Sequence, residues 1–163
     1  MLADRSSGAN FSRCRRFRYT LWRRWDDDGP MVMIIGLNPS TADAHRNDPT
    51  IRRCIRFARD WGAGGLIVTN LFAYRATYPT ELKAAPDPVG PRNDLWIRRM
   101  ASEAGMIVAA WGNHGSWLGR ADRVGRILKG RLGCLRVTAA GQPAHPLYLP
   151  AGLQPRVWDQ TTS

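Results

Sequence analysis

Cysteine is scarce in this chain of 163 residues: it contains only Cys14, Cys54 and Cys134, which lie far apart. Because no Cys-x-x-Cys pair occurs, neither a zinc knuckle nor an iron–sulfur cluster is expected. An odd number of cysteines with no recognisable secretory signal indicates a reducing, cytoplasmic setting. No apolar run approaches the length of a membrane span, so no membrane partner is expected.

Several catalytic signatures are missing as well. The chain has no Gly-x-Ser-x-Gly nucleophile elbow and no glycine-rich phosphate loop of the Walker or Rossmann kind. His45, His114 and His145 lack the spacing of metal ligands. Phosphoryl transfer, hydride transfer and zinc hydrolysis are therefore poorly supported, and we expect neither a metal nor an organic cofactor.

Acidic residues are few: 13 stand against 24 basic residues, nearly all of them arginine, and the net charge is +11. Such a surplus is typical of proteins that bind polyanions, and guanidinium groups suit phosphate oxygens and base stacking. The charge therefore favours a nucleic acid as the partner. The alternative is a surface whose arginines only keep the protein soluble.

Apolar runs that alternate with helical patterns predict one α/β domain. Buried strands are expected at residues 32–36, 66–70 and 106–111, with a short last strand at 134–138. A half-exposed edge strand is expected at 17–22, where apolar and polar residues alternate. The prediction is a three-layer α/β/α fold with a central, mostly parallel sheet of about four strands plus that edge strand.

Helices should cover this sheet. One is expected to begin at Pro49 with Asp48 as its N-cap, and others to span residues 93–104 and 117–129. Residues 71–92 should form a long irregular, lid-like connection. We expect residues 1–15 to be flexible and residues 16–160 to form a single catalytic domain that is a monomer.

Polar residues follow the predicted strands where each of them ends. A Gly-x-Asn-Pro-Ser turn that starts at Gly36 places Asn38 after the first buried strand, and Asn70 ends the next one. Ligands of open α/β sheets gather at such carboxyl ends, so these amides should meet the Trp111–Gly112 turn and the loop at His145. The alternative is that Asn38 only caps its own turn. Amides and an imidazole suit a reaction with a dissociative transition state, which depends on positioning and electrostatics.

Four segments of the chain resemble motifs of the uracil-DNA glycosylase superfamily, nearest to its mismatch-specific uracil/thymine branch, and they occur in the same order along the chain as in that superfamily. Gly36–Ser40 is similar to that branch's Gly-Ile-Asn-Pro-Gly motif, and Thr69–Thr77 to its Thr-Asn-x-x-x-Arg-x-Thr segment. Trp111–Gly112 and His145–Leu149 resemble the Trp-Gly and His-Pro-Ser-Pro-Leu segments of the classical uracil enzymes. The resemblance covers roughly residues 32–150. The chain also resembles a family of small bacterial and phage proteins of unknown function.

The resemblance implies roles for individual residues. Asn38 would hold the attacking water, with Asp43 as its replacement, and His145 would donate a hydrogen bond to the departing base. Leu149 would fill the space that an extruded nucleotide leaves, because base extrusion has to be compensated. The residues expected to bind the base are Gly36, Leu37, Asn70 and Phe72. The residues expected to bind DNA are Ser40, Arg52, Arg75, Asn113, His114, Pro146 and Leu149.

Each of these roles has a structural alternative. Asn70 could simply cap the end of its strand, and His145 could be an ordinary surface-loop residue. Phe72 and Leu149 could pack in the core, while Arg52 belongs to a helix face that could be merely solvated. Asp48 is assigned to helix capping.

The predicted function is hydrolysis of the N-glycosidic bond of a uracil-like, mismatched, damaged or modified base in DNA after base flipping. One alternative is a nucleic-acid-binding protein on the same scaffold that has lost catalysis. The other is an N-glycosidase that acts on free nucleosides or nucleotides. Salt dependence of DNA affinity and the formation of abasic sites would separate the three.

Overall fold

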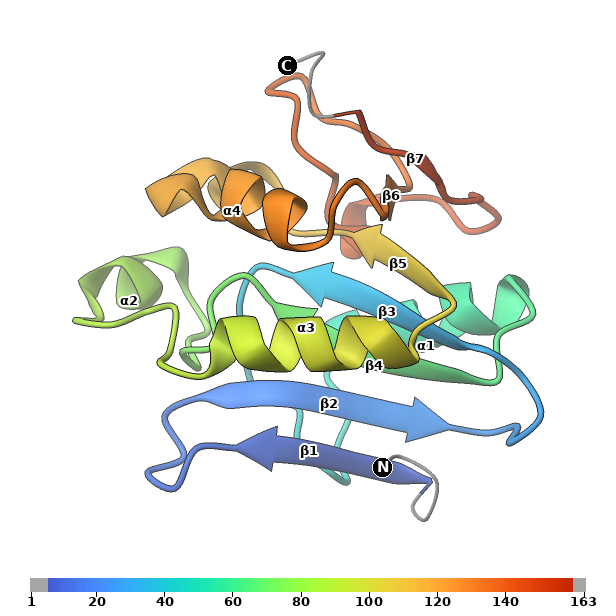
Figure 1. Ribbon diagram of the computed structural model, residues 1–163, viewed down its shortest axis with the longest axis horizontal. Helices are drawn as coiled ribbons and strands as arrows, with labels where there is room; N and C mark the ends of the chain where they lie inside the picture. The colour runs from blue at the N-terminus through green and yellow to red at the C-terminus, as the bar shows by residue number, and fades with distance from the viewer. Residues whose placement is uncertain (1–5, 160–163) are drawn as a thin grey trace.

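The computed structural model describes residues 6–159. Seven strands within this range form one mixed sheet in the order β1-β2-β4-β3-β5-β6-β7 (Figure 1). The strands are β1 (Ser7–Phe11), β2 (Arg18–Arg24), β3 (Met31–Gly36), β4 (Gly65–Asn70), β5 (Met106–Ala109), β6 (Leu132–Cys134) and β7 (Arg156–Val157). The helices are α1 (Pro49–Asp60), α2 (Pro79–Ala84), α3 (Asn93–Glu103) and α4 (Arg120–Ile127), with short 3₁₀ helices η1 (Asn113–Gly119) and η2 (Pro146–Tyr148).

The centre of the sheet is parallel. Strands β4, β3, β5 and β6 run side by side in one direction, whereas β1, β2 and β7 add antiparallel neighbours at the two ends. The apolar runs of β3 and β4 pair in register, with Gly36 opposite Asn70 at their carboxyl ends. The predicted α/β class and the buried strands at residues 32–36 and 66–70 are therefore confirmed.

Alternate side chains of β3 bury against helices on opposite faces of the sheet. Val32 and Ile34 belong to the apolar cluster around α1, whereas Met33 and Ile35 belong to the cluster around α3 and α4. Figure 1 accordingly shows α3 and α4 in front of the sheet and α1 behind it. A run of apolar residues without polar alternation is what a strand covered on both faces requires.

The amino-terminal part differs from the expectation. Residues 1–5 lie outside the described residues, but Ser7–Phe11 form β1 rather than a flexible segment. This strand pairs with β2, and Asn10 Nδ2 donates a hydrogen bond to Thr20 Oγ1 at 2.8 Å. The strand expected at the edge is therefore an inner strand, and its polar residues Arg18 and Thr20 are buried.

Several other helices and strands begin or end at residues that differ from the predicted ones. Within the segment expected to be irregular, Pro79–Ala84 form α2. The helix expected from Trp117 begins at Arg120, because Leu118 and Gly119 have positive φ angles of 54° and 65° that interrupt a helix. The last predicted strand, at 134–138, is observed as Leu132–Cys134. Helix α1 begins at Pro49 as predicted, with Asp48 as its N-cap.

Candidate functional site

A cavity of about 620 Å³ opens at the carboxyl ends of the parallel strands. Its walls come from the turn after β3, the first turn of α1, the end of β4 and the two loops at Trp111 and His145. Asn38, Asn70 and His145, which are distant in sequence, all line it. Gly36, Leu37, Ser40, Asn113, His114 and Pro146 line it as well.

Asn38 is held by hydrogen bonds from its own amide. Its Nδ2 donates to the carbonyl of Ala76 at 2.7 Å and to that of Pro39 at 3.1 Å. The contact with Pro39 is the turn-capping role considered as the alternative, and the contact with Ala76 ties the turn to the segment after β4. Because Nδ2 is engaged, the amide orientation is determined and Oδ1 remains as an acceptor for a ligand or a water.

Asn70 lies at the floor of the cavity and is 3% exposed. Its Oδ1 accepts a hydrogen bond from Arg18 Nη2 at 3.4 Å. A Cβ atom at Gly36 would lie 2.9 Å from Asn70 Nδ2, so this amide needs the glycine beside it. Since an arginine can only donate, the amide presents its Nδ2 as the free group.

Arg18 is a lining residue that the sequence analysis did not identify. It is 2% exposed, and its Nη1 donates to the carbonyl of Ala42 at 3.0 Å. Burial lowers the pKa of the guanidinium to about 10, so Arg18 carries a positive charge at neutral pH. Its buried Nε has no hydrogen-bond partner.

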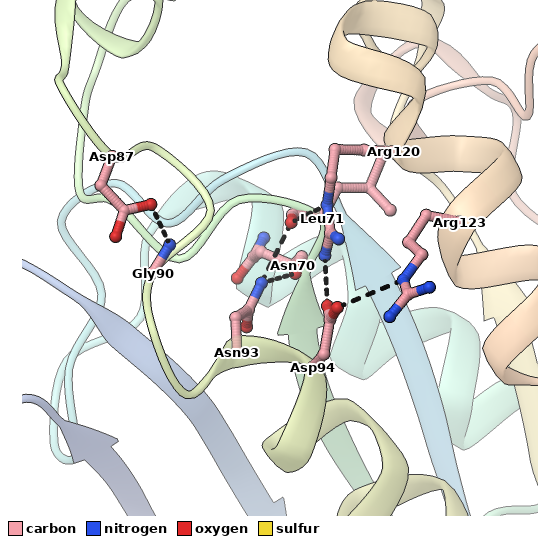
Figure 2. A network of polar contacts seen from close by, with 8 residues as sticks. All are labelled: Asn70, Leu71, Asp87, Gly90, Asn93, Asp94, Arg120 and Arg123. Carbon is pink, nitrogen blue, oxygen red and sulfur yellow. Dashed lines mark hydrogen bonds and ion pairs between the residues drawn. The ribbon is translucent and has the colours of Figure 1, made fainter.

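A network on the far side of the sheet holds the backbone that carries Asn70 (Figure 2). Asn93 Nδ2 donates to the carbonyls of Asn70 at 2.9 Å and Leu71 at 3.0 Å. Arg120 Nε also donates to Leu71 at 2.9 Å, and its Nη2 pairs with Asp94 at 2.7 Å. The starts of α3 and α4 thus fix the end of β4.

The charges in this network support one another. Burial raises the pKa of Asp94, but the hydrogen bond and charge of Arg120 outweigh this effect and hold the pKa below its ordinary value. Arg123 contributes a second ion pair to Asp94 at 3.6 Å. On the same side of the fold, Asp87 caps the turn before α3 through the amide of Gly90 (Figure 2).

His145 is half-buried and serves as the N-cap of η2. Its Nδ1 accepts a hydrogen bond from the amide of Leu147 at 3.2 Å, which places the proton of a neutral ring on Nε2. Burial lowers the pKa of the imidazole, although the charge of Asp48 acts in the opposite direction. The ring is therefore a neutral Nε2–H donor at neutral pH.

Asp48 is the carboxylate among the lining residues. Its Oδ1 accepts a hydrogen bond from the amide of Ile51 at 2.9 Å, which is the helix-capping role that the sequence predicted. Cys54 also lines the cavity, but burial raises its pKa to about 12. This cysteine is consequently a neutral thiol and a poor nucleophile at neutral pH.

Five residues predicted for the site do not line the cavity: Asp43, Phe72, Leu149, Arg52 and Arg75. Asp43 does not line the cavity; its carboxylate accepts hydrogen bonds from the amides of His45 and Arg46, which lower its pKa. Phe72 is fully buried and packs on Trp117, so it cannot stack on a base. Leu149 is 5% exposed and belongs to the apolar cluster around α1, so it cannot act as a wedge.

The loop that follows His145 exposes Leu147 and Tyr148 in place of Leu149. Leu147 is 45% and Tyr148 is 84% exposed, and both line the cavity.

Arg52 is exposed on α1 and contacts the carbonyl of Asn47, outside the cavity. Arg75 also lies outside the cavity. Its guanidinium donates to the carbonyl of Arg15 and stacks on the ring of Phe11.

No group of three or more His, Cys, Asp or Glu side chains within residues 6–159 could hold a metal ion. None of the helices in that range combines the length and the apolar composition that crossing a membrane requires.

Comparison with known proteins gives one family. Residues 18–147 match the model of a family described as "Protein of unknown function (DUF1643)". This span includes β2 and the whole cavity apart from Tyr148. Neither a curated protein nor a solved structure matches the chain, so the resemblance to uracil-DNA glycosylases rests on the sequence motifs alone.

Proposed function

Because the chain belongs to DUF1643, a family whose description states no activity, we propose a function from the cavity itself. The protein is a DNA glycosylase on a uracil-DNA-glycosylase-like α/β/α fold, and it hydrolyses the N-glycosidic bond of an extrahelical base. The observation that carries the proposal is the meeting of Asn38, Asn70 and His145 in one cavity, each with a polar group left for a ligand.

The cavity matches this reaction in size and chemistry. Its volume of about 620 Å³ lies in the range of small-molecule sites and accommodates one nucleoside. Its lining combines apolar side chains such as Ile34 and Trp111 with a few polar groups, which is the usual composition of a site that binds a planar ring.

Bond cleavage in this site proceeds without a strong nucleophile. The bond between the sugar C1′ and the base nitrogen breaks, and the base leaves with the electron pair. The neutral Nε2–H of His145 donates a hydrogen bond to a carbonyl oxygen on which negative charge accumulates, and Nδ2 of Asn70 donates to another acceptor of the base. Electrostatic stabilisation of this kind is worth about 10²- to 10³-fold for one well-placed donor.

Water then completes the reaction. Oδ1 of Asn38 accepts a hydrogen bond from the water, whose oxygen forms the new bond to C1′. An amide is too weak a base to remove the proton that this water loses. The second carboxylate oxygen of Asp48 is the candidate for accepting that proton, because Asp48 lines the same cavity and only its Oδ1 caps α1.

DNA binding would come from charge and from the exposed loop. The net charge of +11 attracts the phosphate backbone. Extrusion of a base costs a few kcal/mol, and the exposed Leu147 and Tyr148 are placed at the cavity mouth to fill the space that the nucleotide leaves.

The proposal is tested with end-labelled oligonucleotides that carry uracil, hypoxanthine, mismatched thymine or a bulky modified pyrimidine. Excision leaves an abasic site, which hot alkali cleaves. Asn38→Ala should abolish cleavage and leave DNA affinity in place. Asn10→Ala is the matched control, because it removes an amide with one side-chain hydrogen bond outside the cavity and should cleave normally.

Three results would distinguish the DNA glycosylase from the two alternative functions. Cleavage of at least one oligonucleotide that depends on Asn38 supports the proposal. Salt-sensitive DNA binding without cleavage of any substrate indicates a binding protein on this scaffold. Release of base from free nucleosides or nucleotides, but not from DNA, indicates the small-molecule enzyme.

A further inference from the structure

Arg18 is a buried cation that faces the cavity without an acidic partner. Two of its five N–H groups are engaged, by the carbonyl of Ala42 and by Oδ1 of Asn70, and both acceptors are neutral. Its Nε is buried with no hydrogen-bond partner. The ion pairs found among residues 6–159 involve Arg24, Arg120 and Arg123, and none involves Arg18.

The charges around Arg18 do not neutralise it. Asp48 and Asp43 are the acidic groups whose charges reach it, but Arg23 and Arg75 oppose them. Each carboxylate accepts backbone hydrogen bonds through its Oδ1, Asp48 at the start of α1 and Asp43 in its own loop, and neither forms an ion pair with Arg18. Arg18 therefore has no directly paired counter-charge among the residues that the structure describes.

A buried charge without a partner is costly, since several kcal/mol of hydration are lost. An anionic ligand bound in the cavity would supply the missing charge. We propose that Arg18 and Asn70 form an oxyanion-binding subsite at the floor of the cavity. Its ligand carries a carboxylate or a phosphate at the end that enters first.

The donors present match an oxyanion. Arg18 has free N–H groups at Nε and at both Nη atoms, and a guanidinium binds two oxygens of one carboxylate or phosphate side by side. Nδ2 of Asn70 adds a third donor, because Oδ1 of the same amide is turned to Arg18. The subsite offers no strong acceptor, so it disfavours a ligand edge that carries N–H donors.

This step rests on the proposed function: together with it, the subsite selects a nucleobase that carries a negative charge over an uncharged nucleobase. A pyrimidine with a carboxyl substituent is the simplest example. The alternative source of the same chemistry is a phosphate group, either free or on a nucleotide.

The experiment is isothermal titration calorimetry at pH 7.5 with the free bases 5-carboxyuracil and thymine and, separately, with inorganic phosphate. The two bases differ chiefly by a carboxylate in place of a methyl group. The wild-type protein should bind 5-carboxyuracil about 10- to 100-fold more tightly than thymine, the range expected for charge-assisted hydrogen bonds. Arg18→Gln should remove this preference, so that the two bases bind with equal affinity.

A second variant covers the case in which Arg18→Gln does not fold. Asn70→Asp has the same shape and places a carboxylate on Arg18, so the guanidinium is neutralised from within. This variant should bind thymine at least as well as 5-carboxyuracil. Circular dichroism would verify the fold of both variants.

Each outcome decides the question. Preference for 5-carboxyuracil that both variants remove supports the subsite with a base as ligand; binding of phosphate alone, lost in the same variants, supports it with phosphate as the source. Equal binding of the two bases without phosphate binding, or no binding at all, overturns it. Base excision from DNA is measured independently, so excision without this preference would overturn the subsite alone, and the preference without excision would overturn the glycosylase alone.

Discussion

Substitution of Gly36 by alanine tests the proposed excision activity separately from the stability of the fold. A Cβ atom at this position would lie 2.9 Å from Asn70 Nδ2, whereas ordinary contacts begin at 3.4 Å. The amide must therefore move by about 0.5 Å, the difference between these two distances. Its hydrogen bond with Arg18 is already long at 3.4 Å, so this shift breaks or redirects it.

The cost to folding should be small because only the end of one side chain moves. Loss of one hydrogen bond costs about 1 kcal/mol, and replacement of glycine by alanine in a strand returns about 0.4 to 1 kcal/mol through the unfolded state. The free energy of urea unfolding should therefore stay within about 1 kcal/mol of wild type. Misplacement of a positioning group should slow excision by about 10- to 100-fold.

Excision by the variant is compared with that of wild type under single-turnover conditions, where binding and product release do not limit the rate. Gly105→Ala is the matched control, since its Cβ would meet Pro30 at an ordinary 3.6 Å, next to the amino-terminal end of β5. The control should excise at the wild-type rate. If Gly36→Ala does so too, Asn70 does not position the base.

Three further changes test other parts of the site. Asp48→Asn should keep the cap of α1, because asparagine caps as well as aspartate, yet slow excision; unchanged excision would exclude Asp48 as proton acceptor. Burial lowers the folded-state pKa of His145 below 6.5, so its contribution to stability is present above that pH and is lost as the pH falls through the lowered value. Urea unfolding between pH 7.5 and 5 should record this loss, and His145→Gln should reduce it. Arg120→Met should cost about 1 to 3 kcal/mol in urea unfolding at pH 7, because it removes a buried hydrogen bond and the main partner of the half-exposed Asp94; a cost below 0.5 kcal/mol would contradict the network.

The central strands and α1 could be predicted because their signals are local. Residues 32–36 and 66–70 are apolar throughout since both faces of the sheet are covered, and Asp48 and Pro49 mark a helix start directly. The site amides were found for a related reason: Asn38 and Asn70 follow two parallel strands, whose carboxyl ends meet at one edge.

The missed features depend on contacts between distant segments. Arg18 occurs in an alternating pattern typical of a half-exposed strand, and only the pairing of β1 with β2 shows that it is buried. Asn93 and Arg120 look like ordinary residues at helix starts, although both bind the carbonyl of Leu71. The side chain of Leu149 faces the core because η2 turns the chain after His145, a direction that residue identity alone does not specify.

The ion pair of Asp94 with Arg123 reaches solvent on the face of the sheet opposite α1. From there a continuous chain of contacts leads through Arg120 and Leu71 to the backbone of Asn70. Substitutions at this surface position can therefore shift the end of β4 and with it the position of Asn70 in the cavity. Laboratory evolution or natural divergence can thus adjust the geometry of the cavity from the opposite face of the sheet while every residue that lines the cavity stays the same.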